Sequence, residues 1–71
     1  MYSMGEKIKI LMLRRNINQK ELANKLGISQ VTLSKKFKLN DFRESDIRKI
    51  ADILDAKFNG QLILNDTKEI I

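Results

Sequence analysis

Residues 18–38 constrain the fold more than any other part of the chain, because they predict two short helices joined by a tight bend. In the first half of this stretch the apolar residues Leu22, Ala23 and Leu26 recur at helical spacing. Gly27 follows them directly, and glycine adopts with little strain the positive φ at which many helices end. We therefore expect one helix to end at Gly27 and a second to begin within three residues.

Both predicted helices carry start signals. Asn18 can cap the first helix, and Glu21, three residues later, can return a hydrogen bond to the Asn18 backbone in a capping box. Ser29 is a favoured cap for the second helix, which we expect to run from Gln30 to about Lys38. The stretch therefore predicts a helix, a turn and a second helix.

The second helix has an inward and an outward face. Leu33 and Phe37 lie four residues apart, so they point to the same side and are expected to pack in the core. The outward face consists of Ser29, Gln30, Val31, Thr32, Lys35, Lys36 and Lys38. This face is mostly polar and basic.

The run QKELANKLGISQVTL, residues 19–33, resembles the helix-turn-helix of the phage-repressor-like (Cro and repressor type) DNA-binding family. The matching positions are Gln19, Leu22, Ala23, Gly27, Ile28 and Leu33. The flanking helices are similar as well, so the likeness covers roughly Met4 to Leu54. Lys36 stands at a site that is usually apolar in the family, and Phe37 takes the inward role instead. The resemblance implies a mainly α fold with a compact four-helix, lambda-repressor-like helix-turn-helix domain.

A first helix is predicted before this motif, from about Met4 to Arg15. Ser3 and Glu6 are spaced as a capping box at its start. Its inward stripe comprises Ile8, Leu11 and Met12, broadened by Ile10 and Leu13. The two arginines at its end suit the negative end of the helix dipole, but Arg15 is also a candidate contact for a phosphate group.

A fourth helix is predicted from about Glu44 to Leu54, after a mostly polar loop. Its apolar residues follow the i, i+3, i+4, i+7 pattern, at Ile47, Ile50, Ala51 and Leu54. In the loop, Asn40 and Asp41 predict a turn, and Phe42 is expected to return to the core. The helix-turn-helix domain is therefore expected to occupy residues 1–55.

The rest of the chain favours strands and turns over helix. Two hairpins are possible. One turns at Asn59-Gly60, the stronger local signal, but its strands are short on one side. We favour the other, which is similar to C-terminal extensions of small family members. It has a strand from Lys57 to Leu64, a turn at Asn65 to Lys68 and a second strand to Ile71, with a bulge or close approach at Gly60.

The hairpin extension, residues 56–71, needs a cover for its apolar side chains, because an isolated two-stranded hairpin is marginally stable in water. The side chains concerned are Leu62, Leu64, Ile70 and Ile71. In one hypothesis the hairpin pairs with its copy in a second chain and makes a homodimer. In the other it folds back on the helices of its own chain.

The whole chain has a formal net charge of +5, and its positive charge is concentrated in the first half. Residues 1–38 hold nine basic and two acidic side chains, a net charge of +7. Residues 39–71 hold five basic and seven acidic side chains, a net charge of −2. A lysine-rich surface can simply favour solubility, but its coincidence with the helix-turn-helix motif favours a polyanionic partner.

Length and composition exclude most other classes of protein. With 71 residues the chain supports one small core, and it lacks the cysteine and histidine of disulfides and zinc sites. No apolar run approaches a membrane span and the first residues do not open a signal peptide, so we expect a cytoplasmic protein without a membrane partner.

Asp52 and Asp55 are better explained as a solvated helix face than as a metal pair. Because no nucleophile lies at motif spacing from a base and no glycine-rich phosphate loop occurs, we expect neither an enzyme nor a cofactor.

The resemblance implies how this chain would contact double-stranded DNA. In the family the second motif helix enters the major groove and the first lies across the backbone. The implied base contacts are Ser29, Gln30, Val31, Thr32 and Lys35. Gln30 is foremost, because its amide can give and accept a hydrogen bond with adenine. The implied phosphate contacts are Arg15, Asn18, Gln19, Lys20, Lys36, Lys38 and Asn40, although Asn18 is better explained as a cap.

The expected function is therefore sequence-specific regulation of transcription, in particular repression. The alternative is a protein-interaction module on the same scaffold, such as an antitoxin or antirepressor, because fold does not fix function. Such a module should expose an apolar groove in place of Lys35, Lys36 and Lys38.

Overall fold

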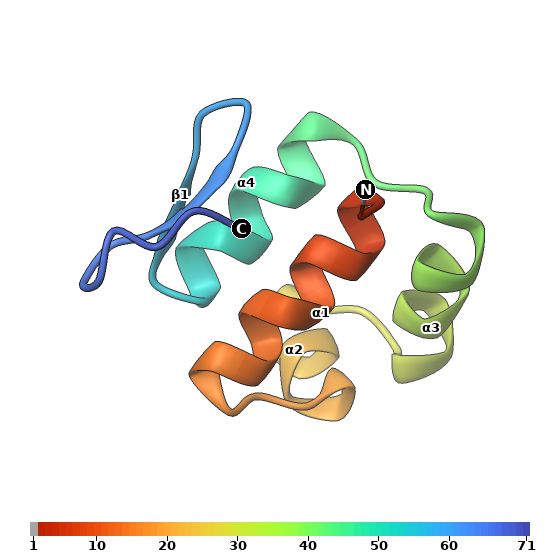
Figure 1. The fold of residues 1–71 in the computed structure, drawn as a ribbon. Coiled ribbons are helices and arrows are strands. Elements are labelled where there is room, and N and C mark those ends of the chain that lie inside the picture. Colours follow the sequence, from red (N-terminus) through yellow and green to blue (C-terminus); the bar gives the residue numbers. More distant parts are fainter. Residues whose placement is uncertain (1) are drawn as a thin grey trace.

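Four helices and a small antiparallel sheet make up the computed structural model, which describes residues 2–71 (Figure 1). The helices are α1 (Met4–Arg15), α2 (Gln19–Leu26), α3 (Gln30–Leu39) and α4 (Glu44–Ile53). The strands are β1 (Ala56–Phe58) and β2 (Leu62–Leu64). The mainly α architecture with a C-terminal hairpin is therefore confirmed. Within residues 2–71, no helix combines the length and the apolar character needed to cross a bilayer.

The predicted helix starts are confirmed, because the expected capping contacts form. A capping box opens α1, and a second opens α2, where the Glu21 N–H donates to Asn18 Oδ1 over 2.8 Å. Ser29 Oγ accepts a backbone N–H of the first turn at the start of α3. The helix ends agree closely with expectation: α3 extends one residue beyond its predicted end, and α4 stops one residue before it.

The helices α1, α2 and α3 each end in a residue with left-handed backbone. The φ angle is 55° at Asn16, 74° at Gly27 and 50° at Asn40. Glycine adopts this conformation freely, and asparagine visits it more readily than most other residues. The chain can therefore turn sharply after each of these helices with little strain.

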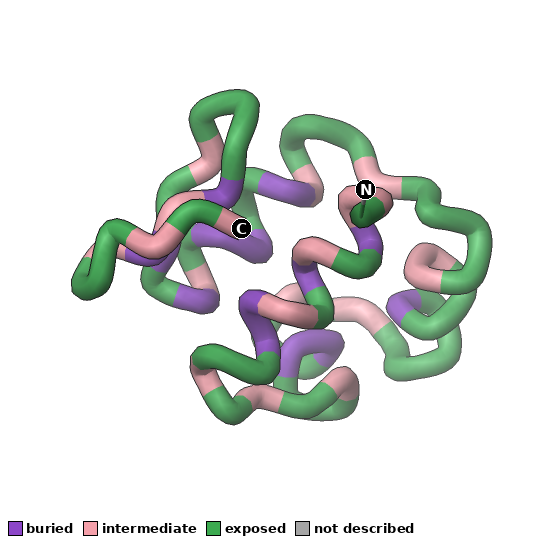
Figure 2. The backbone as a smooth tube through the Cα atoms, viewed as in Figure 1, coloured by how far each residue is buried: buried purple, intermediate pink, exposed green. Residues whose placement is uncertain are grey.

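The core lies where the inward sides of the four helices meet the sheet (Figure 2). Its buried hydrophobic residues are Ile8, Leu11, Met12, Leu22, Ala23, Leu33, Ile47, Ile50, Ala51, Leu54, Ala56, Leu62 and Leu64. This set confirms the inward stripes predicted from Ile8, Leu11 and Met12 and for α4. The prediction that Leu13 broadens the first stripe is wrong, because this side chain is 77% exposed. At about 100° per residue it lies roughly 140° around α1 from Ile8.

The tail forms its hairpin around Asn59-Gly60, the alternative that was not favoured. The pairing is antiparallel, with Ala56 opposite Leu64, Lys57 opposite Ile63 and Phe58 opposite Leu62. The expected continuous strand over residues 57–64 is therefore wrong, as is a bulge at Gly60. Gly60 lies in a three-residue loop and its φ of 70° suits the turn. Pairing starts at Ala56, one residue before the expected strand, so the first strand is long enough to pair.

The predicted turn at residues 65–68 also forms, so β2 lies between two neighbouring segments. A backbone hydrogen bond of 3.0 Å closes this turn. Ile70 then bridges Ile63, and the Ile71 N–H donates to Leu62 O over 2.9 Å. The last residues thus run beside β2 as an isolated bridge, and the full second strand expected up to Ile71 is absent from residues 65–71.

The hairpin packs on the helices of its own chain, which is one of the two alternatives. Leu62 and Leu64 are buried in the same core as the helices, and Ile71 packs against that core. Ile70 remains 57% exposed. Most of the apolar surface that needs a cover therefore finds it without a second chain.

Candidate nucleic-acid interface

Backbone hydrogen bonds around Gly27 hold α2 and α3 in a tight bend. The Gly27 N–H donates to Asn24 O over 3.2 Å, and the Ile28 N–H donates to Ala23 O over 3.1 Å. These bonds satisfy carbonyl groups at the end of α2. Ile28 packs against the core, and Leu33, which is fully buried, fixes the middle of α3. The bend therefore leaves the opposite side of α3 to solvent.

All five predicted base contacts are exposed along this outer side of α3. They are Ser29, Gln30, Val31, Thr32 and Lys35. A shallow depression on the same side is lined by Gln30, Val31, Ser34, Lys35 and Lys38. Val31 is 77% exposed, so it contributes little to the core. The structure thus brings Gln30 and Lys35 to one accessible face.

The hydroxyl groups of Ser29 and Thr32 are engaged with each other. Ser29 Oγ accepts the Thr32 N–H over 3.0 Å and lies 2.8 Å from Thr32 Oγ1. The two side chains therefore act first as the cap of α3. A hydroxyl has one donor and two acceptor positions, so each retains capacity for a further hydrogen bond.

A second shallow depression joins α2 to the start of α3. It is lined by Lys20, Glu21, Ala23, Asn24, Ile28 and Gln30. Gln19 and Lys20 open α2, and their backbone N–H groups find no protein acceptor within residues 2–71. Free N–H groups at the positive end of a helix dipole favour anions. The predicted phosphate contacts Gln19 and Lys20 therefore lie at an anion-favouring helix end, and Lys20 lines the same depression as Gln30.

The lysines Lys20, Lys35 and Lys38 are exposed and make no ion pair within the described residues 2–71. Their ammonium groups therefore remain available to an external anion. They lie on or beside the two depressions, so the positive charge surrounds the outer side of α3.

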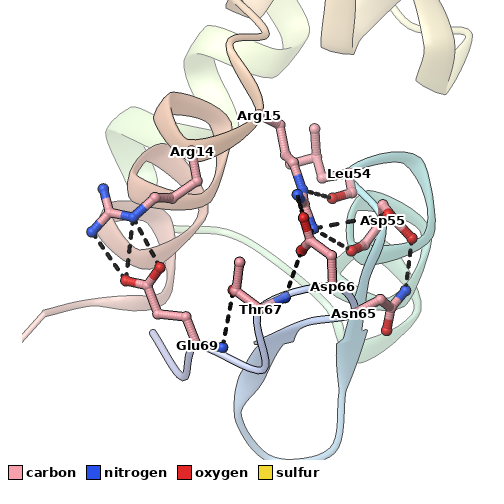
Figure 3. Close-up of polar contacts among 8 residues, drawn as sticks. All are labelled: Arg14, Arg15, Leu54, Asp55, Asn65, Asp66, Thr67 and Glu69. Atoms are coloured by element: carbon pink, nitrogen blue, oxygen red, sulfur yellow. Dashed lines mark hydrogen bonds and ion pairs between the residues drawn. The ribbon is translucent and has the colours of Figure 1, made fainter.

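Arg15, another predicted phosphate contact, is tied to other segments of its own chain (Figure 3). Its Nε donates to Leu54 O over 2.7 Å, and its Nη2 donates to Asp55 O over 2.8 Å. The guanidinium also pairs with the Asp66 carboxylate at 2.8 and 3.0 Å, and these hydrogen bonds hold the pKa of Asp66 well below its usual value. Only 17% of the Arg15 side chain is exposed. Arg15 thus joins the ends of α1 and α4 to the turn at residues 65–68.

Arg14 makes a neighbouring pair with Glu69 (Figure 3). Its Nε and Nη2 donate to the carboxylate at 3.0 to 3.2 Å, and this contact lowers the pKa of Glu69. The partners lie 55 residues apart in the chain, so no local pattern predicts the contact. The two arginines at the end of α1 therefore both hold the C-terminal segment.

Lys36 also has an intramolecular partner. Its Nζ lies 3.4 Å from Asp46 Oδ2, and the two side chains are 28% and 29% exposed. The same oxygen accepts the Arg43 N–H over 3.1 Å, and this hydrogen bond, together with the nearby Lys36 charge, lowers the pKa of Asp46. A lysine can therefore occupy a position that is usually apolar in the resembling family, because its ammonium reaches a carboxylate on α4.

Asn40 and Asn18 likewise use their side chains within the fold. Asn18 Oδ1 accepts the cap hydrogen bond of α2, as expected. Asn40 Oδ1 accepts the Gly5 N–H of α1 over 2.8 Å. Gly5 was not among the predicted site residues. The signal that points to it is a glycine within a helical pattern, which costs about 1 kcal/mol relative to alanine and therefore suggests close packing.

Comparison with known proteins gives one family. A family model described as a Cro/C1-type helix-turn-helix DNA-binding domain matches residues 7–63. The matched span takes in α2, α3 and α4 completely and contains every predicted base and phosphate contact. No curated protein and no solved structure matched the chain.

Proposed function

The chain belongs to the Cro/C1-type helix-turn-helix DNA-binding domains, and we propose that it represses transcription by reading the major groove of double-stranded DNA with α3. The observation that carries the proposal is the outer side of α3, where Gln30 and Lys35 line one exposed depression. The major groove admits an α-helix and displays a distinct pattern of donors and acceptors for each base pair. The proposed role is binding, not catalysis.

The exposed side chains of α3 suit different base edges. Gln30 can give and accept a hydrogen bond with adenine, and Lys35 can donate to guanine. Val31 can press on a thymine methyl group, because its side chain is not committed to the core. Ser29 and Thr32 can contact either kind of base with the hydrogen-bonding capacity that their mutual contact leaves free.

The phosphate contacts proposed first are Gln19, Lys20 and Lys38. Gln19 and Lys20 combine side chains with backbone N–H groups at the start of α2 that have no acceptor within residues 2–71. Lys38 adds, at the far end of α3, an ammonium without an ion pair in the same range. Arg15 and Lys36 would reach phosphate only by leaving their carboxylate partners, so we assign them a smaller share. Phosphate contacts position the protein, whereas base contacts choose the sequence.

We further propose that two chains bind DNA as a homodimer through the hairpin. Ile70, which lies beside β2 on the side away from β1, exposes most of its side chain and offers an apolar contact to a second chain. A dimer would place two half-sites about 10 base pairs apart, or a multiple of that spacing. Sedimentation at several protein concentrations should show a dimer that Ile70→Lys weakens. Monomer mass at every concentration would refute this part of the proposal.

Selection of duplexes from a random pool, at two salt concentrations, tests the proposed function. The wild-type chain should enrich a defined sequence, and affinity should fall steeply as salt rises. Gln30→Ala should cost about 1 to 3 kcal/mol on the enriched duplex and reduce its advantage over a random duplex. Gln61→Ala removes the same amide from the exposed hairpin loop and should leave binding unchanged. Absence of salt-sensitive DNA binding by the wild-type chain would favour the protein-interaction alternative.

A further inference from the structure

The N-terminal end of α1 meets the C-terminal end of α3 (Figure 1). The Gly5 N–H donates to Asn40 Oδ1 over 2.8 Å, although the two residues lie 35 positions apart. This N–H belongs to the first turn of α1, where a helix supplies no acceptor of its own. Asn40 in turn ends α3 with a φ of 50°. One side chain therefore satisfies the start of α1 while its backbone terminates α3.

The two helix ends approach so closely that a side chain at Gly5 would press on Asn40. A Cβ built on Gly5 would lie 3.1 Å from Asn40 Oδ1, 3.5 Å from the Phe42 ring and 3.7 Å from the Phe37 ring. The two rings pack edge to face, with centroids 5.2 Å apart. Lys9, one turn after Gly5, places its Nζ 5.2 Å from the centre of the Phe37 ring. The contact thus involves both the side chain that ends α3 and an aromatic residue of its last turn.

We propose that Asn40 is a positioning residue that fixes the angle of α3 for DNA reading, an inference that rests on the proposed function. Leu33 anchors the middle of α3, and Phe37 and the Lys36–Asp46 pair hold its last turn. Asn40 adds to these a directional hydrogen bond to the backbone of α1. At about 1.5 Å per residue, Asn40 lies about 10 Å from Leu33, and Gln30 lies about 5 Å to the other side.

This geometry links Asn40 to base recognition. A displacement of about 1 Å at Asn40 would swing Gln30 by about 0.5 Å, which equals the whole range of good hydrogen-bond lengths, about 2.7 to 3.2 Å. Flexible lysines on the same helix can follow a phosphate through such a shift. Loss of the anchor therefore reduces discrimination between sequences more than it reduces affinity for DNA in general.

Two variants of Asn40 separate its side chain from its backbone role. Asn40→Gly removes the acceptor but keeps a residue that adopts positive φ freely. Asn40→Asp keeps an acceptor oxygen, and Asp55 shows that aspartate takes a φ of 53° in this chain. The measurements are hydrogen exchange of the Gly5 amide, urea unfolding, and the ratio of affinities for a duplex enriched by the wild-type chain and a random duplex.

In Asn40→Gly the Gly5 amide should exchange faster, and the affinity ratio should fall about three- to tenfold. Asn40→Asp should retain the protection of Gly5 and the ratio, even if its negative charge weakens binding to both duplexes. Gly5→Ala should lower the ratio from the other side of the contact, because its Cβ displaces Asn40 Oδ1. It should lower the ratio no further when Asn40 is already glycine.

The possible failures are distinguishable. Unchanged Gly5 exchange in Asn40→Gly would overturn the bond between the helix ends. Faster exchange with an unchanged affinity ratio would overturn the positioning role, and reduced stability alone would not rescue it. A wild-type chain that prefers no duplex would overturn the proposed function and this assignment with it, while Gly5 exchange would still report whether Asn40 joins α1 to α3.

Discussion

Replacing Gly27 by alanine should destabilise the fold through the backbone alone. Gly27 has a φ of 74°, and a Cβ built there would have no heavy atom within 4 Å, so crowding does not contribute. The left-handed conformation costs an L-residue about 1 to 2 kcal/mol, of which about 0.4 to 1 kcal/mol is offset by the smaller entropy of unfolded alanine. We therefore expect a net loss of about 1 kcal/mol, or roughly 4 to 8 °C in melting temperature for a domain of this size.

Two further variants isolate the backbone as the cause. Gly60 has a φ of 70° in equally open space, so Gly60→Ala should lose a similar amount. Gly27→Asn should lose less than Gly27→Ala, because the chain itself uses asparagine in this conformation at Asn16 and Asn40. Thermal and urea unfolding followed by circular dichroism measure all three. A Gly27→Ala chain as stable as the wild type would refute the argument, and equal losses for alanine and asparagine would show that another factor sets the cost.

Three other predictions concern the core, the tail and the phosphate contacts. Leu33→Ala should lower the free energy of unfolding by about 2 to 5 kcal/mol, because this fully buried side chain would leave a cavity under α3; a loss below about 1 kcal/mol in urea would contradict its anchoring role. The arginines of α1 lower the pKa values of Asp66 and Glu69 in the folded chain. The two ion pairs therefore stabilise the fold above the usual pKa values of 3.8 and 4.5, and this stabilisation is lost as the pH falls through the lowered pKa values of the folded chain. Between about pH 6 and about pH 3 the urea midpoint of the wild type should therefore fall further than that of the double variant Asp66→Asn, Glu69→Gln, and equal falls would exclude a contribution from these pairs. Lys38→Ala should weaken binding to enriched and random duplexes alike and reduce the slope of log affinity against log salt by about one, whereas Lys57→Ala on β1 should leave the slope unchanged; a loss confined to one sequence would contradict a phosphate contact.

The helix-turn-helix and its caps could be predicted because their determinants are local. The capping partners Asn18 and Glu21 lie three residues apart, and Gly27 needs no distant contact to adopt its φ. The exposed side of α3 follows from the same pattern, since Leu33 and Phe37 define the inward side. All five predicted base contacts therefore lie at the surface, as expected from the sequence.

Contacts between distant segments could not be predicted in this way. Arg15 and Asn40 both look like solvent-exposed phosphate ligands in the sequence, yet each bonds a partner at least 35 residues away. Periodicity reports which side of a helix is polar, but not whether a polar side chain on that side meets another part of the chain. The partners of Arg15 and Asn40 emerge only from the packing of α1 against α3, α4 and the tail.

The tail was mispredicted because two turn signals compete within a few residues. Both turns form, at Asn59-Gly60 and at residues 65–68, whereas we expected only the second. Burial decides the outcome, since the observed register places Leu62 and Leu64 in the helical core. Strand length and the likeness to C-terminal extensions of small family members, the two grounds for expecting the second turn, do not include this gain.

The burial of Leu62 and Leu64 has a consequence for synthesis on the ribosome. All four helices emerge before the strand that closes their shared interior, because translation proceeds from α1 towards β2. At about 5 to 20 residues per second, synthesis of the segment from the end of α4 to the end of β2 takes on the order of one second. A nascent chain stalled before Leu62 and Leu64 have emerged leaves the apolar side chains of the helices exposed where β2 would cover them. Such a chain should become resistant to protease only after Leu64 has left the exit tunnel.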